Sequence, residues 1–532
     1  MSNSMKKVLS EMQRQAVYGG ADAVNKEGFP AWKTPLSKRF VQVLNTGSFG
    51  NSFYASQREL VGESIKTLQE GIEKLPEDFL KTEIVKGRNE GFMRTAPITA
   101  LALFRKKYPK SFKEIFSSVI RTGNDMEDFI AINRAFQYGF GRAVKTAMNQ
   151  WLINIHEYQA IKYKNQIANA MRISRPKTQF PHLLDYVATV FKNIPEKQAK
   201  QILKTFPQVK HFELAKLAFT NGNLMEGIRH LKEGRVPFPA IIGSVQTDDV
   251  RFWTEAMRQM GVMQLIKYTS KLSRVGVFDD SENIEYYRKV ITSENLTKAK
   301  VLPFRIAIMH REIKDSVPVS ILKHLEGVLE DYVCKFDWGV WNGRWAIAVD
   351  VSGSMTAPFT NTMSYATIAG VFSGILAKGL KNKAVIIPVD TRIRKDILKE
   401  FSSAESVMKK VHIIEEADGG GTYLEEAVKY LIRNKIPVDH FVLITDSEEW
   451  GEGWLRSWIA YKNKIAPKAE AFFIRIDPYK TSPYSEKATE HYNIYNVFGW
   501  NDNVLKFIEF QLMYNRTQSL RSKIQGEQRE LG

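Results

Sequence analysis

The sequence predicts a multidomain protein in which an all-α helical-repeat module, residues 1–344, precedes an α/β doubly wound domain, residues 345–532. Three observations predict this architecture. The chain has 532 residues, which is more than one hydrophobic core usually supports. Apolar residues recur at helical spacing through the first part, whereas the second part alternates short apolar runs with helical patterns. The net charge is also divided unequally between the two parts.

Successive helices of ordinary length are predicted from Ile98 to Leu329. Pro109 separates the first two because proline interrupts a helix. The clearest apolar stripes are Ile98, Leu101, Ala102 and Phe104; Phe112, Ile115, Phe116 and Val119; Val144, Ala147, Met148, Trp151, Leu152 and Ile155; and Trp253, Ala256, Met257 and Met260. No strict sequence period is present, so the pattern favours an irregular α-solenoid, curved or ring-shaped, over a regular repeat array.

Short β-rich runs alternate with helical patterns after Arg344. The predicted strands are Trp345–Val351, Ala384–Val389, His440–Thr445 and Ala471–Ile476. Almost continuously apolar runs of this kind are typical of parallel strands that helices cover on both faces. In such sheets ligands bind at the carboxyl ends of the strands. The polar residues at those ends are therefore the candidates for a functional site.

The net charge of +18 lies almost entirely in the first module. Its 344 residues hold 52 Lys and Arg against 35 Asp and Glu, a net charge of +17, whereas the remainder holds 24 against 23. This distribution favours a polyanionic partner for the helical module. A basic surface that interacts only with solvent is the alternative.

Neither a membrane span nor a secretory signal is predicted. The chain has no apolar stretch long enough to cross a bilayer, and residues 1–10 lack the apolar segment of a signal peptide. We therefore expect a cytoplasmic protein. Cys334 is the only cysteine, which excludes an internal disulfide framework and a zinc site built from several thiolates.

Oxygen-bearing side chains follow two predicted strands and precede a predicted helix. Asp350, Ser352 and Ser354 alternate at the end of the first strand, so their side chains point the same way. Thr422 ends the loop that begins Asp418-Gly-Gly-Gly, and Asp446 follows a later strand. Hydroxyls and carboxylates without His or Cys suit Mg²⁺ or another hard divalent ion. The sequence therefore predicts a divalent-metal site that is open to an external ligand.

These segments allow other interpretations. The Asp-x-Ser-x-Ser segment alone also fits a strand-to-loop turn capped by serine. The glycine triplet resembles a phosphate-binding loop, but no Gly-Lys-Ser/Thr follows it. An aspartyl phosphatase would need a second carboxylate where Ser352 stands, and no general base is evident near Asp350. Hydrolysis is thus poorly supported.

Basic residues alternate with aromatic and apolar residues between Gly139 and Lys177. A predicted helix runs from Gly139 to Trp151, and the next contains the segment Ile161-Lys-Tyr-Lys164. Lysine and arginine on one outer surface would contact phosphates. A solvated helix face is the alternative for this stretch taken alone.

The order of motifs along most of the chain resembles the Ro autoantigen (TROVE) family. The motifs are Gly139-Phe-Gly-Arg-Ala143, Lys162-Tyr-Lys164, Arg172-Ile-Ser-Arg-Pro-Lys177 and Leu302-Pro-Phe-Arg305, together with the early segment Gly47-Ser-Phe-Gly50 and Phe53-Tyr54. The C-terminal part is similar to von Willebrand factor A domains, through Asp350-Val-Ser-Gly-Ser354, Gly-Gly-Thr422 and Thr445-Asp446. That similarity implies a metal-ion-dependent adhesion site formed by Asp350, Ser352, Ser354, Thr422 and Asp446.

The resemblance implies a monomeric ring of HEAT-like helices that the A domain closes. Such a ring binds small noncoding Y RNAs on its outer surface and single-stranded 3′ ends of misfolded RNAs in its hole, without catalysis. We therefore expect a role in RNA quality control, in which RNA is presented to an exoribonuclease, and no DNA or membrane partner. Carried over by position, the RNA-binding residues are Arg142, Lys145, Lys162, Lys164, Arg172, Ser174 and Arg175.

Two positions depart from the family pattern. Tyr423 stands where the family carries aspartate, and Arg175 stands where it carries histidine. In A domains the serines and the threonine contact the ion directly or through water, and an acidic group of a partner completes its coordination. A protein-interaction scaffold that grips an acidic partner through Mg²⁺ is therefore the main alternative function.

Overall fold

The structure is a computed structural model whose description leaves out several short segments and both ends. It describes residues 23–24, 30–33, 35–46, 57–90, 93–242, 245, 247–299, 301, 303–359, 363–446, 453–476, 481–482, 492–498, 504–505, 508–509 and 511–513. The segment Gly47–Gly50 with Phe53 and Tyr54, part of the family resemblance, lies outside the described residues, as do residues 1–10.

The chain folds into two compact units. The helical unit comprises residues 68–295 and 315–321, and the sheet unit comprises the described parts of residues 1–67, 296–314 and 322–532. Helix α20 (Pro303–Ile313) therefore belongs to the sheet unit. It is tied there by the Arg311 guanidinium, whose Nε donates to Glu415 Oε1 at 2.5 Å.

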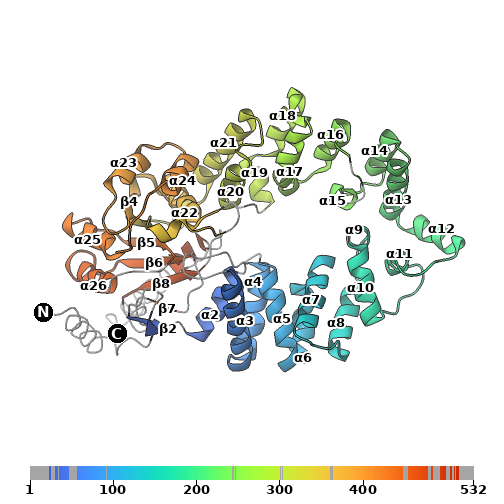
Figure 1. Ribbon diagram of the computed structural model, residues 1–532, viewed down its shortest axis with the longest axis horizontal. Coiled ribbons are helices and arrows are strands. Elements are labelled where there is room, and N and C mark those ends of the chain that lie inside the picture. The colour runs from blue at the N-terminus through green and yellow to red at the C-terminus, as the bar shows by residue number, and fades with distance from the viewer. Residues whose placement is uncertain are drawn as a thin grey trace, which may run out of the picture. The chain divides into compact units, whose positions relative to one another are not determined.

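Consecutive helices make up the helical unit (Figure 1), and they pack mainly against helices one to three positions away along the chain. They are α4 (Glu77–Asn89), α5 (Thr95–Lys107), α6 (Pro109–Val119), α7 (Gly123–Ala135), α8 (Arg142–Leu152), α9 (Glu157–Lys162), α10 (Lys164–Ser174), α11 (Leu183–Ala188), α12 (Glu196–Thr205), α13 (Pro207–Thr220), α14 (Leu224–Glu233), α15 (Phe238–Ile241), α16 (Val250–Gln259), α17 (Val262–Arg274) and α18 (Ser281–Val290). The helix α3 (Gln57–Lys74) and the helices α19 (Ser293–Lys298) and α21 (Val319–Lys335) extend across the residue limits of the two units. The predicted all-α helical fold of this part of the chain is confirmed.

The apolar stripes form the core of this unit. All eight residues of the first two stripes, on α5 and α6, are buried. Pro109 is the first residue of α6, where the missing N–H costs nothing because that position has no intrahelical partner. Removal of each large apolar side chain from water contributes about 1.5–3 kcal/mol, so these stripes fix which helix faces meet. None of the described helices combines the length and apolarity that crossing a bilayer requires.

The second basic helix is divided in two. The sequence predicted one helix through the segment 161–164, whereas α9 ends at Lys162 and α10 begins at Lys164. Tyr163 between them has φ −113° and ψ 30°, outside the helical region. A Cβ on Gly123 would lie 2.3 Å from the Tyr163 Cβ, so Tyr163 packs directly on the backbone of α7. This tertiary contact accompanies the break in the helix.

The sheet unit contains a parallel five-stranded sheet of order β4-β3-β5-β6-β8. Its strands are β3 (Trp345–Asp350), β4 (Ala384–Val389), β5 (His440–Thr445), β6 (Glu470–Arg475) and β8 (Ile494–Phe498). The four predicted strands are confirmed within one residue, and the edge strand β8 was not predicted. A small antiparallel sheet joins β1 (Ala23–Val24), β2 (Pro30–Lys33) and β7 (Thr481–Ser482).

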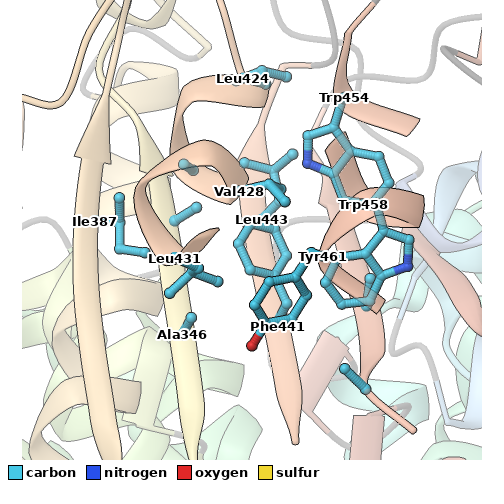
Figure 2. Close-up of a cluster of buried hydrophobic side chains, with 14 of the residues drawn as sticks. Ala346, Ile387, Leu424, Val428, Leu431, Phe441, Leu443, Trp454, Trp458 and Tyr461 are labelled. Carbon is cyan, nitrogen blue, oxygen red and sulfur yellow. The ribbon is translucent and has the colours of Figure 1, made fainter. Parts of the chain in front are cut away.

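Helices cover the five-stranded sheet, as a doubly wound domain requires. They include α22 (Tyr365–Leu380), α23 (Lys395–Ser403), α24 (Val407–Glu415), α25 (Glu425–Arg433) and α26 (Trp454–Lys464), and α2 (Leu36–Thr46) contacts β8. Figure 2 shows one core, in which Trp454, Trp458 and Tyr461 of α26 lie beside Phe441 of β5. These four side chains are at most 1% exposed. The predicted α/β doubly wound fold is confirmed.

Candidate metal and nucleic-acid sites

The carboxyl ends of the central strands bring three aspartates to one edge of the sheet. β3 lies between β4 and β5, and the chain leaves β3 first toward β4 and then crosses to β5. Doubly wound folds bind ligands at the strand ends where the strand order reverses in this way. Asp350 ends β3, Asp390 follows β4 and Asp446 follows β5, and all three are buried. The topology alone therefore places acidic groups at the edge of the sheet where a ligand is expected.

Asp350 is the anchor of the site. Its Oδ1 accepts the Ser352 N–H at 2.9 Å, and its Oδ2 accepts the Thr445 hydroxyl at 2.7 Å, so the carboxylate is held by two strand ends. Burial raises the pKa of Asp350, and the nearby Asp390 carboxylate raises it further, while the hydrogen bonds oppose the shift. A divalent cation would compensate this buried negative charge.

The two serines lie close enough to share one ion. Ser352 Oγ and Ser354 Oγ are 3.1 Å apart, and both residues are buried. Adjacent ligands of an octahedral ion with bonds of about 2.1 Å are separated by roughly 3 Å, so the spacing fits Mg²⁺. The residues present thus fit a hard divalent ion both in donor chemistry and in spacing.

The glycine-rich loop 418–422 packs on the loop that carries the serines. Gly353 N–H donates to Gly420 O at 2.8 Å. A Cβ on Gly419 would lie 1.7 Å from Val351 O, so only glycine permits this approach. Two further predicted ligands are buried near these loops, each 2% exposed. They are Thr422, two residues after Gly420, and Asp446, which follows Thr445. The structure therefore brings the loops of all five predicted metal ligands to the carboxyl edge of the sheet.

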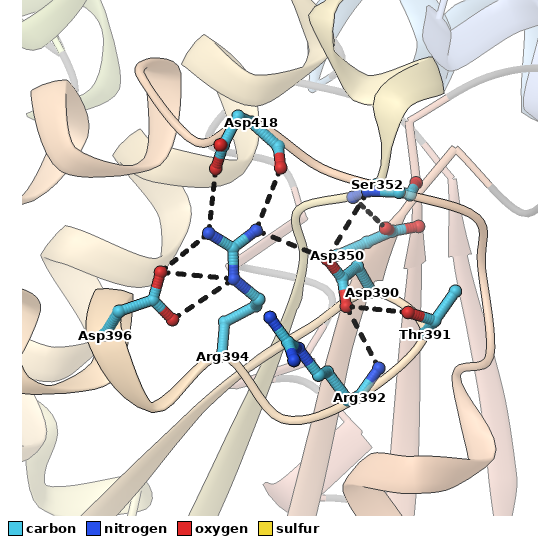
Figure 3. Close-up of polar contacts among 9 residues, drawn as sticks. Asp350, Ser352, Asp390, Thr391, Arg392, Arg394, Asp396 and Asp418 are labelled. Atoms are coloured by element: carbon cyan, nitrogen blue, oxygen red, sulfur yellow. Dashed lines mark hydrogen bonds and ion pairs between the residues drawn. The ribbon is translucent and has the colours of Figure 1, made fainter.

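Figure 3 shows Asp390 and Arg394 among the polar contacts near Asp350. Neither residue was identified from the sequence. Asp390 Oδ1 accepts the Arg392 N–H at 3.0 Å, and its Oδ2 lies 3.3 Å from Arg394 Nη1. Arg394 also donates to Asp418 at the start of the glycine-rich loop, at 2.8 Å from Nη2 to Oδ1. The arginine therefore joins the β4 end to that loop. The rule that selected Asp350 and Asp446, a carboxylate directly after a buried strand, would also have selected Asp390.

Tyr423, the departure from the family pattern, supports the site through its backbone. Its N–H donates to Asp390 O at 2.9 Å, and its side chain is 38% exposed. A backbone bond of this kind does not depend on the side chain, so tyrosine is compatible with the observed loop.

Four of the seven predicted RNA-binding residues present their side chains to solvent. Arg142 and Lys145 are exposed on α8, Arg172 is exposed on α10, and Arg175 is exposed at the carboxyl end of α10. The helices α8 and α10 contact one another. Within the described part of the chain no carboxylate lies within ion-pair distance of these four side chains, so their charges are available to an external anion.

Lys162 and Lys164 are instead held against tyrosines. Lys162 Nζ donates to Tyr158 OH at 2.8 Å. Lys164 Nζ lies 3.7 Å from the centre of the Tyr186 ring and 3.7 Å from Glu213 Oε1, and burial lowers the pKa of Lys164. Both lysines therefore also have contacts within the protein, which the sequence did not indicate.

Ser174 does not lie with the exposed residues. Its side chain is 6% exposed, and its hydroxyl donates to Ala170 O at 2.9 Å within α10. Its own carbonyl oxygen accepts from Asn149 Nδ2 of α8 at 3.2 Å. The structure thus places Ser174 in the contact between α8 and α10.

Comparisons with known proteins agree with this architecture. Residues 344–474 match the family model described as the Ro60 vWA domain. The chain is 22% identical over 457 residues to the RNA-binding protein RO60 of Deinococcus radiodurans, which covers 80% of this chain and 83% of the relative. The crystal structure of the Deinococcus radiodurans RO (RSR) protein superposes with a TM-score of 0.63 at 18% identity, covering 90% of this chain and 99% of that one.

Proposed function

We propose that this chain, a member of the Ro protein family with a C-terminal von Willebrand factor A domain, is a non-enzymatic RNA-binding protein. The relative from Deinococcus radiodurans carries RNA binding in its name. The observation that carries the proposal is a group of exposed basic side chains on the contacting helices α8 and α10 that form no ion pair with a described carboxylate, although Arg172 lies 5.0 Å from the centre of the Phe191 ring. We call it the α8–α10 basic group: Arg142, Lys145, Arg172 and Arg175.

The α8–α10 basic group would bind a small noncoding, Y-like RNA mainly through its phosphates. Arginine and lysine side chains that neutralise phosphates release condensed counterions, which makes the affinity fall steeply with salt. Lys162 and Lys164 add positive charge near this surface, although the amino group of each also contacts a tyrosine side chain. The module that carries them holds +17 of the net charge of +18.

A second RNA surface is part of the proposal. Single-stranded 3′ ends of misfolded RNAs would bind in the hole of a monomeric ring, separately from the structured RNA outside. The protein would then act in cytoplasmic RNA quality control, where it presents RNA to an exoribonuclease. This two-surface arrangement rests on the family resemblance and on the basic charge of the helical module.

The test compares two variants that lose the same charge. One replaces the α8–α10 basic group with alanine, and the control replaces four exposed basic residues of α16, α17 and α18 with alanine: Arg258, Lys267, Arg274 and Lys289. Affinities of the full chain for a structured small RNA and for a bare single strand are measured by fluorescence anisotropy over a range of salt. Each effective phosphate contact that is lost should reduce the slope of log affinity against log salt by about 0.9.

The first variant should bind structured RNA weakly and with a smaller salt slope, while its affinity for the single strand changes little. The control should keep both affinities. Equal losses for both RNAs would reject two separate surfaces, and equal losses in both variants would show that only net charge matters. Unchanged binding in the first variant would make the basic group a solvated helix face, and the protein-scaffold alternative would then be preferred.

The A-domain site is proposed to hold Mg²⁺ through five ligands, and the nearby Asp390 carboxylate would add negative charge beside them. The ligands are Asp350, Ser352, Ser354, Thr422 and Asp446. The bound ion would supply an open coordination position for an acidic group of a partner. Calorimetry with Mg²⁺ should show binding to the wild type and none to an Asp350→Ala, Ser352→Ala double variant. RNA affinity should be nearly equal in the two proteins, because the basic group belongs to the helical unit.

A further inference from the structure

The hairpin of α13 and α14 carries a second group of metal-ligating side chains, far along the chain from the A-domain site. Figure 1 shows these two helices side by side, and they pack closely. His211 lies on α13, and His230 and Glu233 lie on the last turn of α14. The two imidazoles are largely buried, at 18% and 12% side-chain exposure, whereas Glu233 is 46% exposed.

Three atoms of this group face a common point. His211 Nδ1 and His230 Nδ1 are 3.4 Å apart, and Glu233 Oε2 lies 3.8 Å from the first and 3.7 Å from the second. The point equidistant from three atoms at these separations is about 2.1 Å from each of them, which matches Zn–N and Zn–O bond lengths. The triangle therefore has approximately the dimensions of a metal site.

A neighbouring carboxylate favours the tautomer of His230 that leaves Nδ1 free to bind a metal ion. Glu226 Oε1 lies 3.2 Å from His230 Nε2, which places the ring hydrogen on Nε2 and leaves Nδ1 with a lone pair toward the other ligands. Metal-ligating histidines usually donate their second ring N–H to such a carboxylate. Arg229 binds Glu226 in turn, which orients this carboxylate.

The backbone is shaped to admit His211. Gly234 follows α14, and a Cβ there would lie 2.2 Å from the His211 Cβ, so any other residue would push α13 away. An ordinary surface ion pair would account for the contact between Glu226 and Arg229, which lie on the same helix. It does not explain why a second imidazole from another helix turns its Nδ1 to the same point.

We propose that His211, His230 and Glu233 form a binding site for a divalent transition-metal ion of intermediate hardness. Zn²⁺ is the ion used to test the proposal. Two imidazoles and a carboxylate suit zinc better than Mg²⁺, which prefers oxygen ligands. Three protein ligands leave a fourth position for water. On binding, His211 moves its single ring proton from Nδ1 to Nε2, so both imidazoles bind as neutral ligands and no proton needs to leave the protein.

The experiment uses the full chain without an affinity tag, titrated calorimetrically with Zn²⁺ in millimolar Mg²⁺ so that the oxygen site of the A domain is saturated. The variants are His211→Gln and His230→Gln. The second can still donate to Glu226 but has no ring nitrogen to bind the ion. The matched control is His412→Gln, because His412 forms a single i,i+4 pair with Glu416 and has no second histidine in its group. Circular dichroism and melting without zinc verify that each variant is folded.

The wild type and the control should bind one equivalent of Zn²⁺, and both α13–α14 variants should bind at least tenfold more weakly. Co²⁺ in the wild type should give the intense visible absorption of a four-coordinate site, and the folded variants should not. Absence of Zn²⁺ binding by the wild type in excess Mg²⁺ would overturn the proposal. Equal binding by the wild type and the folded variants would overturn it as well.

Discussion

Replacement of Gly419 with alanine should separate the two loops that form the A-domain site. The new Cβ would lie 1.7 Å from Val351 O and 2.6 Å from the Ser352 carbonyl carbon, whereas ordinary contact begins at 3.4 Å. Because the clashing atoms belong to the backbone, the loops must move apart by roughly 1.5 Å. That movement breaks the hydrogen bond from Gly353 N–H to Gly420 O, now 2.8 Å long.

The expected cost follows from these two effects. Overpacking of a close contact costs about 1–3 kcal/mol, and the broken hydrogen bond adds about 1 kcal/mol, so the loss of stability is about 2–4 kcal/mol. The affinity for Mg²⁺ should also fall at least about tenfold, because the loop that carries Thr422 moves away from the serines. Urea unfolding followed by tryptophan fluorescence and Mg²⁺ calorimetry measure the two effects.

Gly420→Ala is the matched control. A Cβ at Gly420 would meet its nearest atoms at 3.9 Å, in ordinary contact with Thr391, and neither glycine has a positive φ. This variant should keep both the stability and the Mg²⁺ affinity of the wild type within about 1 kcal/mol. If the two alanine variants behave alike, close approach at Gly419 is not what holds the loops together, and our account of the site is wrong.

Three further changes test other parts of the sheet unit. Asp390→Asn places an amide against Arg394, so Mg²⁺ affinity should fall at least about tenfold by calorimetry, and an unchanged affinity would remove Asp390 from the site. Hydrogen bonds from Arg394 lower the pKa of Asp396 to about 2, so its contribution to stability is full above its ordinary pKa of 3.8 and is lost as the pH falls through 2. Asp396→Asn should therefore cost less than about 1 kcal/mol at pH 7, since this side chain is 60% exposed, and the difference from wild type in urea midpoints should vanish on acidification. Trp458→Ala should destabilise the unit by about 3–5 kcal/mol in the same assay, and a loss below 1 kcal/mol would contradict its place in the core.

The basic residues between 139 and 177 show that a local sequence pattern does not by itself predict which side chains are exposed. Alternating charge between 139 and 177 indicated an exposed basic surface, and Arg142 and Arg175 are exposed as expected. The same pattern did not distinguish Lys164, which lies against Tyr186 from another helix. Nor did it indicate that Ser174 is buried between helices. Sequence spacing describes one helix face, whereas burial depends on which helix packs against it.

The sequence by itself determined the helical stripes, the four central strands and the placement of oxygen-bearing side chains around Asp350. These features are periodic or lie within a few residues of a strand end, because side-chain direction repeats every 3.6 residues in a helix and every two in a strand. Only the tertiary structure decided that Arg394 links the end of β4 to Asp418, and that His211 meets His230 and Glu233. Those contacts join separate elements, and their geometry is set by how buried surfaces pack, which no local period encodes.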